Sequence, residues 1–140
     1  SPVIDTNGNG VIQISEAQAF TGLLNVSGEG ITDFMGLQEF VNITGFNGSD
    51  NDAEYLDLSS NTSVVSLNFQ NSPQLINVNF RTGSNSSVIS FEGLNCPELI
   101  FVCVDDVAFA DVNFTNIDPH VIRSARGKIT CVYWLTSITR

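Results

Sequence analysis

Residues 56–80 read LDLSSNTSVVSLNFQNSPQLINVNF, and the pattern of this stretch continues in the residues that follow. Each unit has an apolar, a polar and a second apolar residue, then a polar turn, then another apolar residue near the ninth position. The alternation predicts a short strand, and the turn predicts a reversal of the chain. The units begin at Leu56, Leu67, Val78, Phe91 and Val102, so their starts lie 11, 11, 13 and 11 residues apart.

One such unit cannot bury its own apolar side, so the units must stack. In a coil of stacked units each strand gains a parallel neighbour, and the apolar residues form one continuous core. An antiparallel sandwich also has strands at about this spacing. Hairpins need no fixed unit length, however, and the constant apolar phase favours the coil. We therefore expect an α/β repeat fold with a single parallel sheet of short strands and few helices.

The segment YLDLSSNTSVVSLNFQNSPQLINVNF resembles leucine-rich repeats of the short kind, about 21–23 residues long, found in secreted bacterial proteins. The resemblance covers about residues 23–105 and implies a leucine-rich-repeat solenoid capped at both ends. It also implies that Asn61 and Cys96 fill a turn position whose side chain satisfies buried backbone groups. Ser72 would fill the same position weakly, and Gly83 cannot fill it.

The ends of a repeat array need caps, because each end otherwise exposes apolar surface. Residues 1–22 are expected to form the N-terminal cap, in which ISEAQAFTG predicts a short helix that ends at Gly22. Its residues Ile14, Ala17 and Phe20 would cover the first repeat. In the following segment, 31–43, every third residue is apolar, which predicts a short helix or 3₁₀ stretch packed in the core.

Residues 106–140 are expected to form the C-terminal cap and a basic tail. The stretch VCVDDVAFADVNFTNIDPHV resembles a terminal segment that closes bacterial leucine-rich-repeat arrays. That resemblance implies a disulfide between Cys103 and Cys131, which would leave Cys96 free, and an oxidising compartment. The tail 123–140 contains four basic residues and no acidic one, and it is a possible handle for a homodimer.

The stretch DTNGNGVIQISE, residues 5–16, fits the calcium-loop pattern D-x-[DN]-x-[DN]-G-x5-E. Calcium prefers six or more oxygen ligands, and Gly10 permits the sharp turn around the ion. The loop resembles a single EF-hand loop without an entering helix or a second loop. The alternative is a polar turn and helix cap that binds no metal. The predicted Ca²⁺ ligands are Asp5, Asn7, Asn9, Val11 (through its carbonyl), Gln13 and Glu16.

The net charge of −10 makes nucleic acids and anionic membranes poor partners. No apolar run is long enough to span a bilayer, so membrane insertion is not expected. No catalytic motif is present: the single histidine, His120, has no partner motif, and a hydrolase that uses Glu92 is a remote alternative. The chain is therefore not expected to be an enzyme.

Residues that alternate with the inward anchors should lie in columns on the exposed sheet. Such an open face is where repeat proteins bind partners; the alternative is an ordinary solvated face whose asparagines hydrogen-bond along the column. The residues chosen as ligand-binding candidates are Tyr55, Asp57, Asn68, Asn79, Glu92 and Phe101. The expected function is recognition of an extracellular protein or glycan, or adhesion, by a secreted or cell-surface protein. A structural spacer or self-assembling unit is the alternative.

Overall fold

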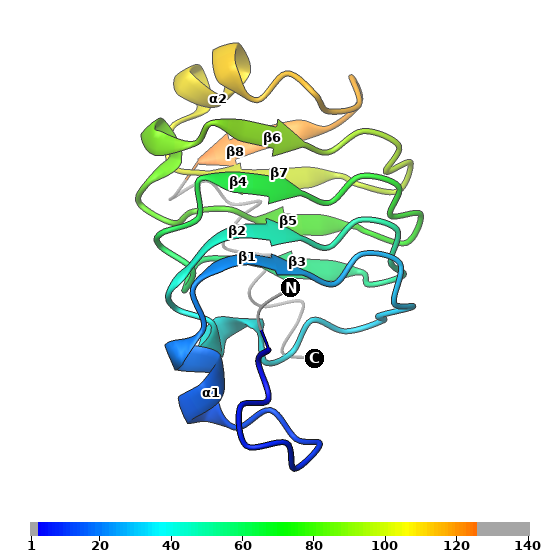
Figure 1. Ribbon diagram of the computed structural model, residues 1–140. Helices are drawn as coiled ribbons and strands as arrows, with labels where there is room; N and C mark the ends of the chain where they lie inside the picture. Colours follow the sequence, from blue (N-terminus) through cyan, green and yellow to red (C-terminus); the bar gives the residue numbers. More distant parts are fainter. Residues whose placement is uncertain (1–2, 126–140) are drawn as a thin grey trace.

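The computed structural model describes residues 3–125 and contains eight short strands, two α-helices and two 3₁₀ turns (Figure 1). None of the described helices is long and apolar enough to cross a membrane. The helical elements are α1 (Ile14–Ala19), η1 (Leu37–Glu39), η2 (Asn85–Ser87) and α2 (Val107–Asn113). The strands are β1 (Gly22–Asn25), β2 (Ile43–Asn47), β3 (Tyr55–Asp57), β4 (Ser66–Asn68), β5 (Asn77–Asn79), β6 (Ser90–Glu92), β7 (Phe101–Val104) and β8 (Ile122–Ala125).

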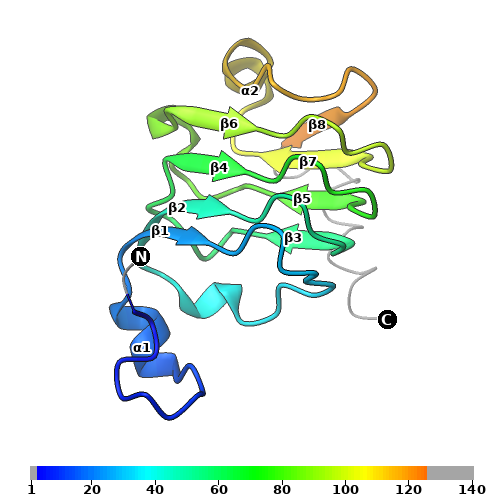
Figure 2. The same ribbon diagram turned by 45° about the vertical axis from the view of Figure 1, so that its right-hand side comes forward.

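The strands form two parallel sheets, which Figure 2 shows side by side. The first sheet has the order β1-β2-β4-β6 and the second has the order β3-β5-β7-β8. From β2 to β7 the chain alternates between the sheets, so each strand pairs with the strand two units away. Leu67 of β4 thus lies beside Phe91 of β6, and Leu56 of β3 lies beside Val78 of β5.

The prediction of a single sheet was therefore wrong, although the α/β class and the parallel pairing were right. One unit of 11 residues brings the chain only to the opposite sheet, and a second unit is needed to bring it back. The 13-residue unit from Val78 to Phe91 contains two extra residues, and η2 lies within it. Because the extra length lies in the connection, β6 keeps its register with β4.

The core is one continuous cluster of apolar side chains contributed by both sheets. Phenylalanine rings continue it from unit to unit, with Phe69 edge-on to Phe91 and Phe91 stacked on Phe114 at 4.5 Å between ring centroids. The predicted inward anchors are all buried: Leu56, Leu58, Leu67, Phe69, Val78, Phe80 and Phe91.

Buried polar side chains satisfy backbone groups at the connections. Asn61 donates to the carbonyls of Leu37 and Phe40, while Ser72 and Cys96 both donate to the carbonyl of Phe69. The roles of Asn61 and Cys96 agree with the prediction, and Ser72, which was expected to fill the position only weakly, donates to the Phe69 carbonyl at 2.8 Å.

Two further asparagines have the same role and were missed. Asn51 donates to the carbonyl of Val26 and accepts from the N–H of Ile31. Asn85 takes the position that Gly83 was expected to leave empty, because the two-residue insertion shifts the phase of this connection. Its amide donates to the carbonyl of Phe80 and its Oδ1 accepts from the N–H of Asp105.

The two ends differ in how completely they are covered. At the N-terminal end α1 buries Ala17, and Phe20 directly after it is also buried, but Ile14 is 59% exposed. Ile14 was expected to cover the first repeat, and that expectation was wrong because it lies in the first turn of a six-residue helix. At the other end α2 leads into Phe114, which packs on Phe91 and is 1% exposed.

The segment 31–43 contains η1, which agrees with the predicted 3₁₀ stretch. Leu37 and Ile43 are buried, but Ile43 already belongs to β2. Phe34 and Phe40 are partly buried and pack against the same core. The apolar spacing in this segment therefore reflects burial on one side of an irregular connection rather than one continuous helix.

Replacing Asn85 with alanine should destabilise the fold, because the Phe80 carbonyl and the Asp105 N–H would lose their buried partner. We expect a loss of roughly 1–3 kcal/mol in the free energy of unfolding, measured by urea denaturation. Asn42→Ala is the matched control, since Asn42 is exposed and makes one bond, to the carbonyl of Gln18. Equal losses in the two variants would contradict the role assigned to Asn85.

Candidate metal loop and ligand-binding faces

The predicted calcium loop precedes α1 and is folded around the carboxylate of Asp5. Asp5 Oδ1 accepts from the N–H groups of Gly8 at 2.8 Å and Asn9 at 3.2 Å, and Oδ2 accepts from Gly10 N–H at 2.8 Å. Gly10 has φ +84°, a left-handed conformation that glycine adopts without strain. The sharp turn predicted at Gly10 is therefore present.

The other predicted side-chain ligands lie in the same loop. Asn7 Oδ1 accepts from Asn9 N–H, Asn9 Oδ1 accepts from Val11 N–H, and Asn7 Nδ2 donates to Gln13 Oε1 at 3.0 Å. These oxygens belong to the hard-ligand class that calcium takes. The described residues contain no group of three or more His, Cys, Asp or Glu side chains placed to hold a metal. Only two of the six predicted ligands are carboxylates, so this loop could not form such a group.

Glu16 closes the loop onto the helix and is 7% exposed. Its Oε1 accepts from Thr6 N–H at 2.8 Å, Thr6 Oγ1 at 2.9 Å and Asn7 N–H at 3.2 Å. Its Oε2 accepts from Gln13 N–H at 3.1 Å and completes a capping box at the start of α1. These bonds, with that from Gln13 foremost, lower the pKa of Glu16. Glu16 thus caps helix α1, as the metal-free alternative requires. Its carboxylate also contacts the loop of residues 5–16.

The ligand-binding candidates do not share one face. Asn68 and Glu92 are partners in the first sheet, on β4 and β6. The others lie in the second sheet: Tyr55 and Asp57 on β3, Asn79 on β5 and Phe101 on β7. This division follows from the alternation of the chain between the sheets.

The column of asparagines has a local structural role. The Oδ1 atoms of Asn47, Asn68, Asp57 and Asn79 each accept the backbone N–H two residues further on, which ends the strand in an Asx turn. Asn79 also accepts from Arg81 Nε and is 2% exposed. The side-chain bonds expected along the column are thus replaced by bonds within each unit.

Side-chain bonds from unit to unit do occur, but at the corner after the first sheet. Asn95 Nδ2 donates to Asn71 Oδ1 at 3.0 Å, and Asn71 Nδ2 donates to Asp50 Oδ1 at 3.2 Å. All three residues have φ between 56° and 61°. Asn and Asp tolerate this left-handed conformation better than other non-glycine residues.

Two of the three cysteines lie in the described part of the chain. Cys96 is a free, buried thiol, and burial raises its pKa to about 11. Cys103 is disulfide-bonded. Its predicted partner, Cys131, and most of the basic tail lie outside the described residues.

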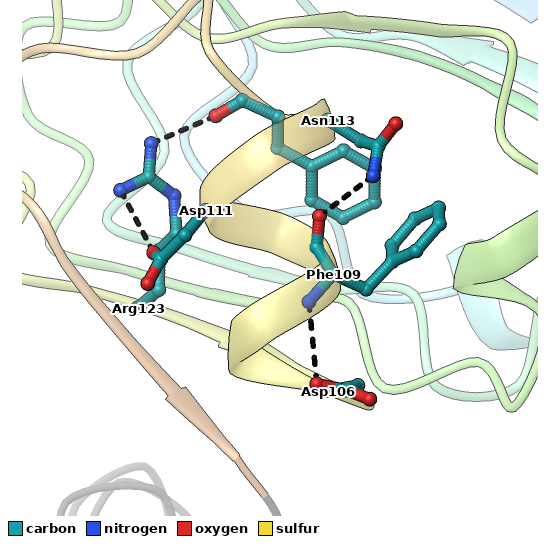
Figure 3. Close-up of polar contacts among 6 residues, drawn as sticks. Asp106, Phe109, Asp111, Asn113 and Arg123 are labelled. Carbon is teal, nitrogen blue, oxygen red and sulfur yellow. Dashed lines mark hydrogen bonds and ion pairs between the residues drawn. The ribbon is translucent and has the colours of Figure 1, made fainter.

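Carboxylates near the C-terminal end hold neighbouring loops. Asp105 accepts from the N–H groups of Gly83 and Asn85, and Asp118 accepts from those of Asn95 and Cys96. Figure 3 shows Asp106, the N-cap of α2, accepting from Phe109 N–H.

Arg123 of β8 is tied to α2 by two contacts, which Figure 3 also shows. It pairs with Asp111 at 3.4 Å and donates to the carbonyl of Phe114 at 2.8 Å. Because Phe114 packs on the core, these contacts join the second sheet to the terminal helix. From the sequence, Arg123 was predicted only to belong to the basic tail.

A groove that the sequence analysis missed lies beside β3. It is about 660 Å³ in volume and is formed by part of the segment 32–38 and by residues between Asp52 and Asp57. Two of the candidates, Tyr55 and Asp57, line it. The only signal in the sequence is the density of acidic residues in NGSDNDAEYLD.

The comparison with protein-family models and the searches of curated proteins and of solved structures find no match for this chain. The family resemblance therefore stays a prediction.

The hydrogen bonds of Glu16 predict a pH-dependent contribution to stability. Its folded-state pKa is lower than the ordinary value of 4.5. The contribution is therefore complete above about pH 4.5 and is lost as the pH falls through the folded-state pKa. We expect Glu16→Gln to melt below the unmodified chain by a gap that is constant at neutral pH and narrows under acid conditions.

Thermal melts at a series of pH values, without added metal, measure this gap. Glu29→Gln is the matched control, because Glu29 is exposed and no hydrogen bond ties it to the loop. A gap for Glu16→Gln that is unchanged down to pH 3 would contradict the role of the ionised carboxylate.

Proposed function

We propose that this chain is a leucine-rich-repeat module of the secreted bacterial type that recognises an extracellular protein or glycan without catalysing a reaction. In this proposal the two parallel sheets are two sides of one coil. The observation that carries the proposal is the in-register stacking of equivalent strands, which repeats equivalent outward positions at about 4.8 Å intervals. Such repetition builds an extended surface from small units.

The disulfide-bonded state of Cys103 supports the extracellular location. Disulfides persist in oxidising compartments and are rare in the cytosol. The net charge of −10 argues for a partner other than a nucleic acid or an anionic membrane.

Of the two sheets, the first offers partly exposed polar residues in adjacent positions. Ser66, Asn68, Ser90 and Glu92 are all of intermediate exposure. Asn68 uses Oδ1 for its Asx turn, so Nδ2 is the atom that would contact a ligand. Glu92 accepts from Asn116 Nδ2 at 3.1 and 3.2 Å, which orients the carboxylate.

A binding screen against extracellular proteins and polysaccharides should identify a ligand whose affinity falls in Asn68→Asp combined with Glu92→Gln. Asp retains the Asx-turn acceptor, so this pair changes the surface with little effect on the fold. We expect at least a fivefold loss, because the pair alters a donor and a charge in adjacent positions. The matched control is Asn113→Asp combined with Glu98→Gln, two exposed positions outside the strands.

Equal losses in the two pairs would contradict binding at the first sheet. A chain that binds nothing in the screen but self-associates in sizing chromatography would instead support a spacer or assembly unit.

We also propose that the loop of residues 5–16 binds calcium and thereby stabilises the N-terminal cap. The donor set is entirely oxygen, and the side chains of Asp5, Asn7 and Asn9 are already folded into one loop by hydrogen bonds. The ion would supply positive charge to these oxygens. With only two carboxylates, the affinity should lie roughly in the micromolar to millimolar range.

Calcium at a hundred times its Kd should raise the free energy of unfolding by about 2.7 kcal/mol. Titration calorimetry measures the binding, and thermal melts with and without EDTA measure the stabilisation. Asp5→Ala should abolish both effects, whereas Asp111→Ala, which alters an exposed carboxylate far along the chain, should leave both intact. No calcium heat together with an unchanged melting temperature in EDTA would contradict the proposal.

A further inference from the structure

The groove beside β3 combines negative charge with apolar surface. Four carboxylates line it: Asp33, Asp52, Glu54 and Asp57. No lysine, arginine or histidine is among its described lining residues. Like charges gathered in one concave surface focus a negative potential and attract a cationic ligand.

Contacts within the protein leave oxygens of these four carboxylates available to a ligand. Asp33 and Asp57 each use one oxygen, Oδ1, for an N–H, that of Met35 and that of Ser59 respectively. Asp52 and Glu54 are exposed, and no hydrogen bond or ion pair joins their side chains to other described residues. The two arginines among the described residues are engaged by other groups: Arg81 bonds to Asn79, the strand partner of Asp57, and Arg123 pairs with Asp111.

The apolar wall distinguishes this groove from a plain acidic patch. Met35 lines it and is 83% exposed, although methionine side chains are usually buried. Phe34 lies next to it, held edge-on against Phe46 of β2 with 5.5 Å between the ring centroids. A small inorganic cation would gain nothing from such a wall. The side chain of a lysine or arginine would, because its aliphatic stem packs on apolar surface while its charged head reaches a carboxylate.

The groove also lies along the first strand of the second sheet, since β3 ends the order β3-β5-β7-β8. Glu54 precedes β3 and Asp57 ends it, while Asp33 and Met35 come from the segment 32–38. Carboxylates thus come from both segments that line the groove, so one peptide with several cationic side chains can pair with more than one of them.

We propose that the groove between residues 32–38 and β3 binds a lysine- or arginine-rich peptide segment of a partner protein. The inference deepens the proposed function, since it requires that the chain recognises a protein. It adds a second site for a protein partner, in a groove beside the second sheet that is separate from Asn68 and Glu92 on the first.

The test is the binding of fluorescein-labelled nona-arginine to the full chain, followed by fluorescence anisotropy at physiological salt. Asp52→Asn combined with Glu54→Gln removes two groove charges and should weaken binding about fivefold, as expected for two exposed charge pairs. The matched control, Glu29→Gln combined with Glu98→Gln, removes two exposed charges outside the groove and should change the affinity less than twofold.

Met35→Ser tests the apolar wall at constant charge and should weaken binding by a further two- to threefold. Circular dichroism of each variant checks that the fold is kept. Because both double variants carry the same net charge, the comparison separates the groove from general attraction to an acidic protein.

Equal losses in the two double variants would overturn the proposal, because binding would then follow net charge alone. Displacement of the peptide by millimolar calcium, with no effect of Met35→Ser, would overturn it in favour of a cation site. If either result is found while a screened ligand still depends on Asn68 and Glu92, the groove assignment fails and the proposed function stands.

Discussion

The structure depends on how backbone groups are satisfied where the chain turns between two sheets of three- to five-residue strands. Such short strands leave many turns, and each turn brings carbonyls and N–H groups next to a phenylalanine-rich core. An unpaired group there would cost more than a hydrogen bond is worth in solution. Asn51, Asn61 and Asn85 supply the missing partners, with two or more bonds each. These bonds close the turns that connect the parallel strands.

Toward the C-terminal end, carboxylates satisfy backbone N–H groups in the same way. Asp105 and Asp118 each accept two N–H groups from a loop 20 to 23 residues earlier in the chain. At the other end Glu16 accepts from the loop before α1 and from the helix start. Much of the acidic surface thus has an architectural role, and the acidic residues without such bonds stand out. Asp52 and Glu54 belong to this second group, and both line the groove beside β3.

The sequence predicts the strands well because their apolar residues recur at a fixed spacing and are buried for that reason. The period of 11 residues alone does not distinguish one sheet from two, although the resemblance to repeats of 21–23 residues implied that two units make one repeat. The position of Asn85 was missed because the insertion after Arg81 changes the phase at the turn. Of the candidate site, the loop at residues 5–16 was found from local spacing, whereas the groove joins segments about twenty residues apart that no motif links.

The insertion itself shows where this architecture accepts added length. Two residues more than in the neighbouring units are taken up beside η2, while Ser66, Leu67 and Asn68 keep their partners Ser90, Phe91 and Glu92. Strand pairing therefore fixes the residues of each unit that lie in a strand. The length of the connection between β5 and β6, which forms a rim of the fold, can vary. A foreign loop could be grafted onto that rim at the exposed Ser86 and Ser87, after the buried Asn85, so the fold can serve as a display scaffold whose inserted segment leaves the pairing of the sheets unchanged.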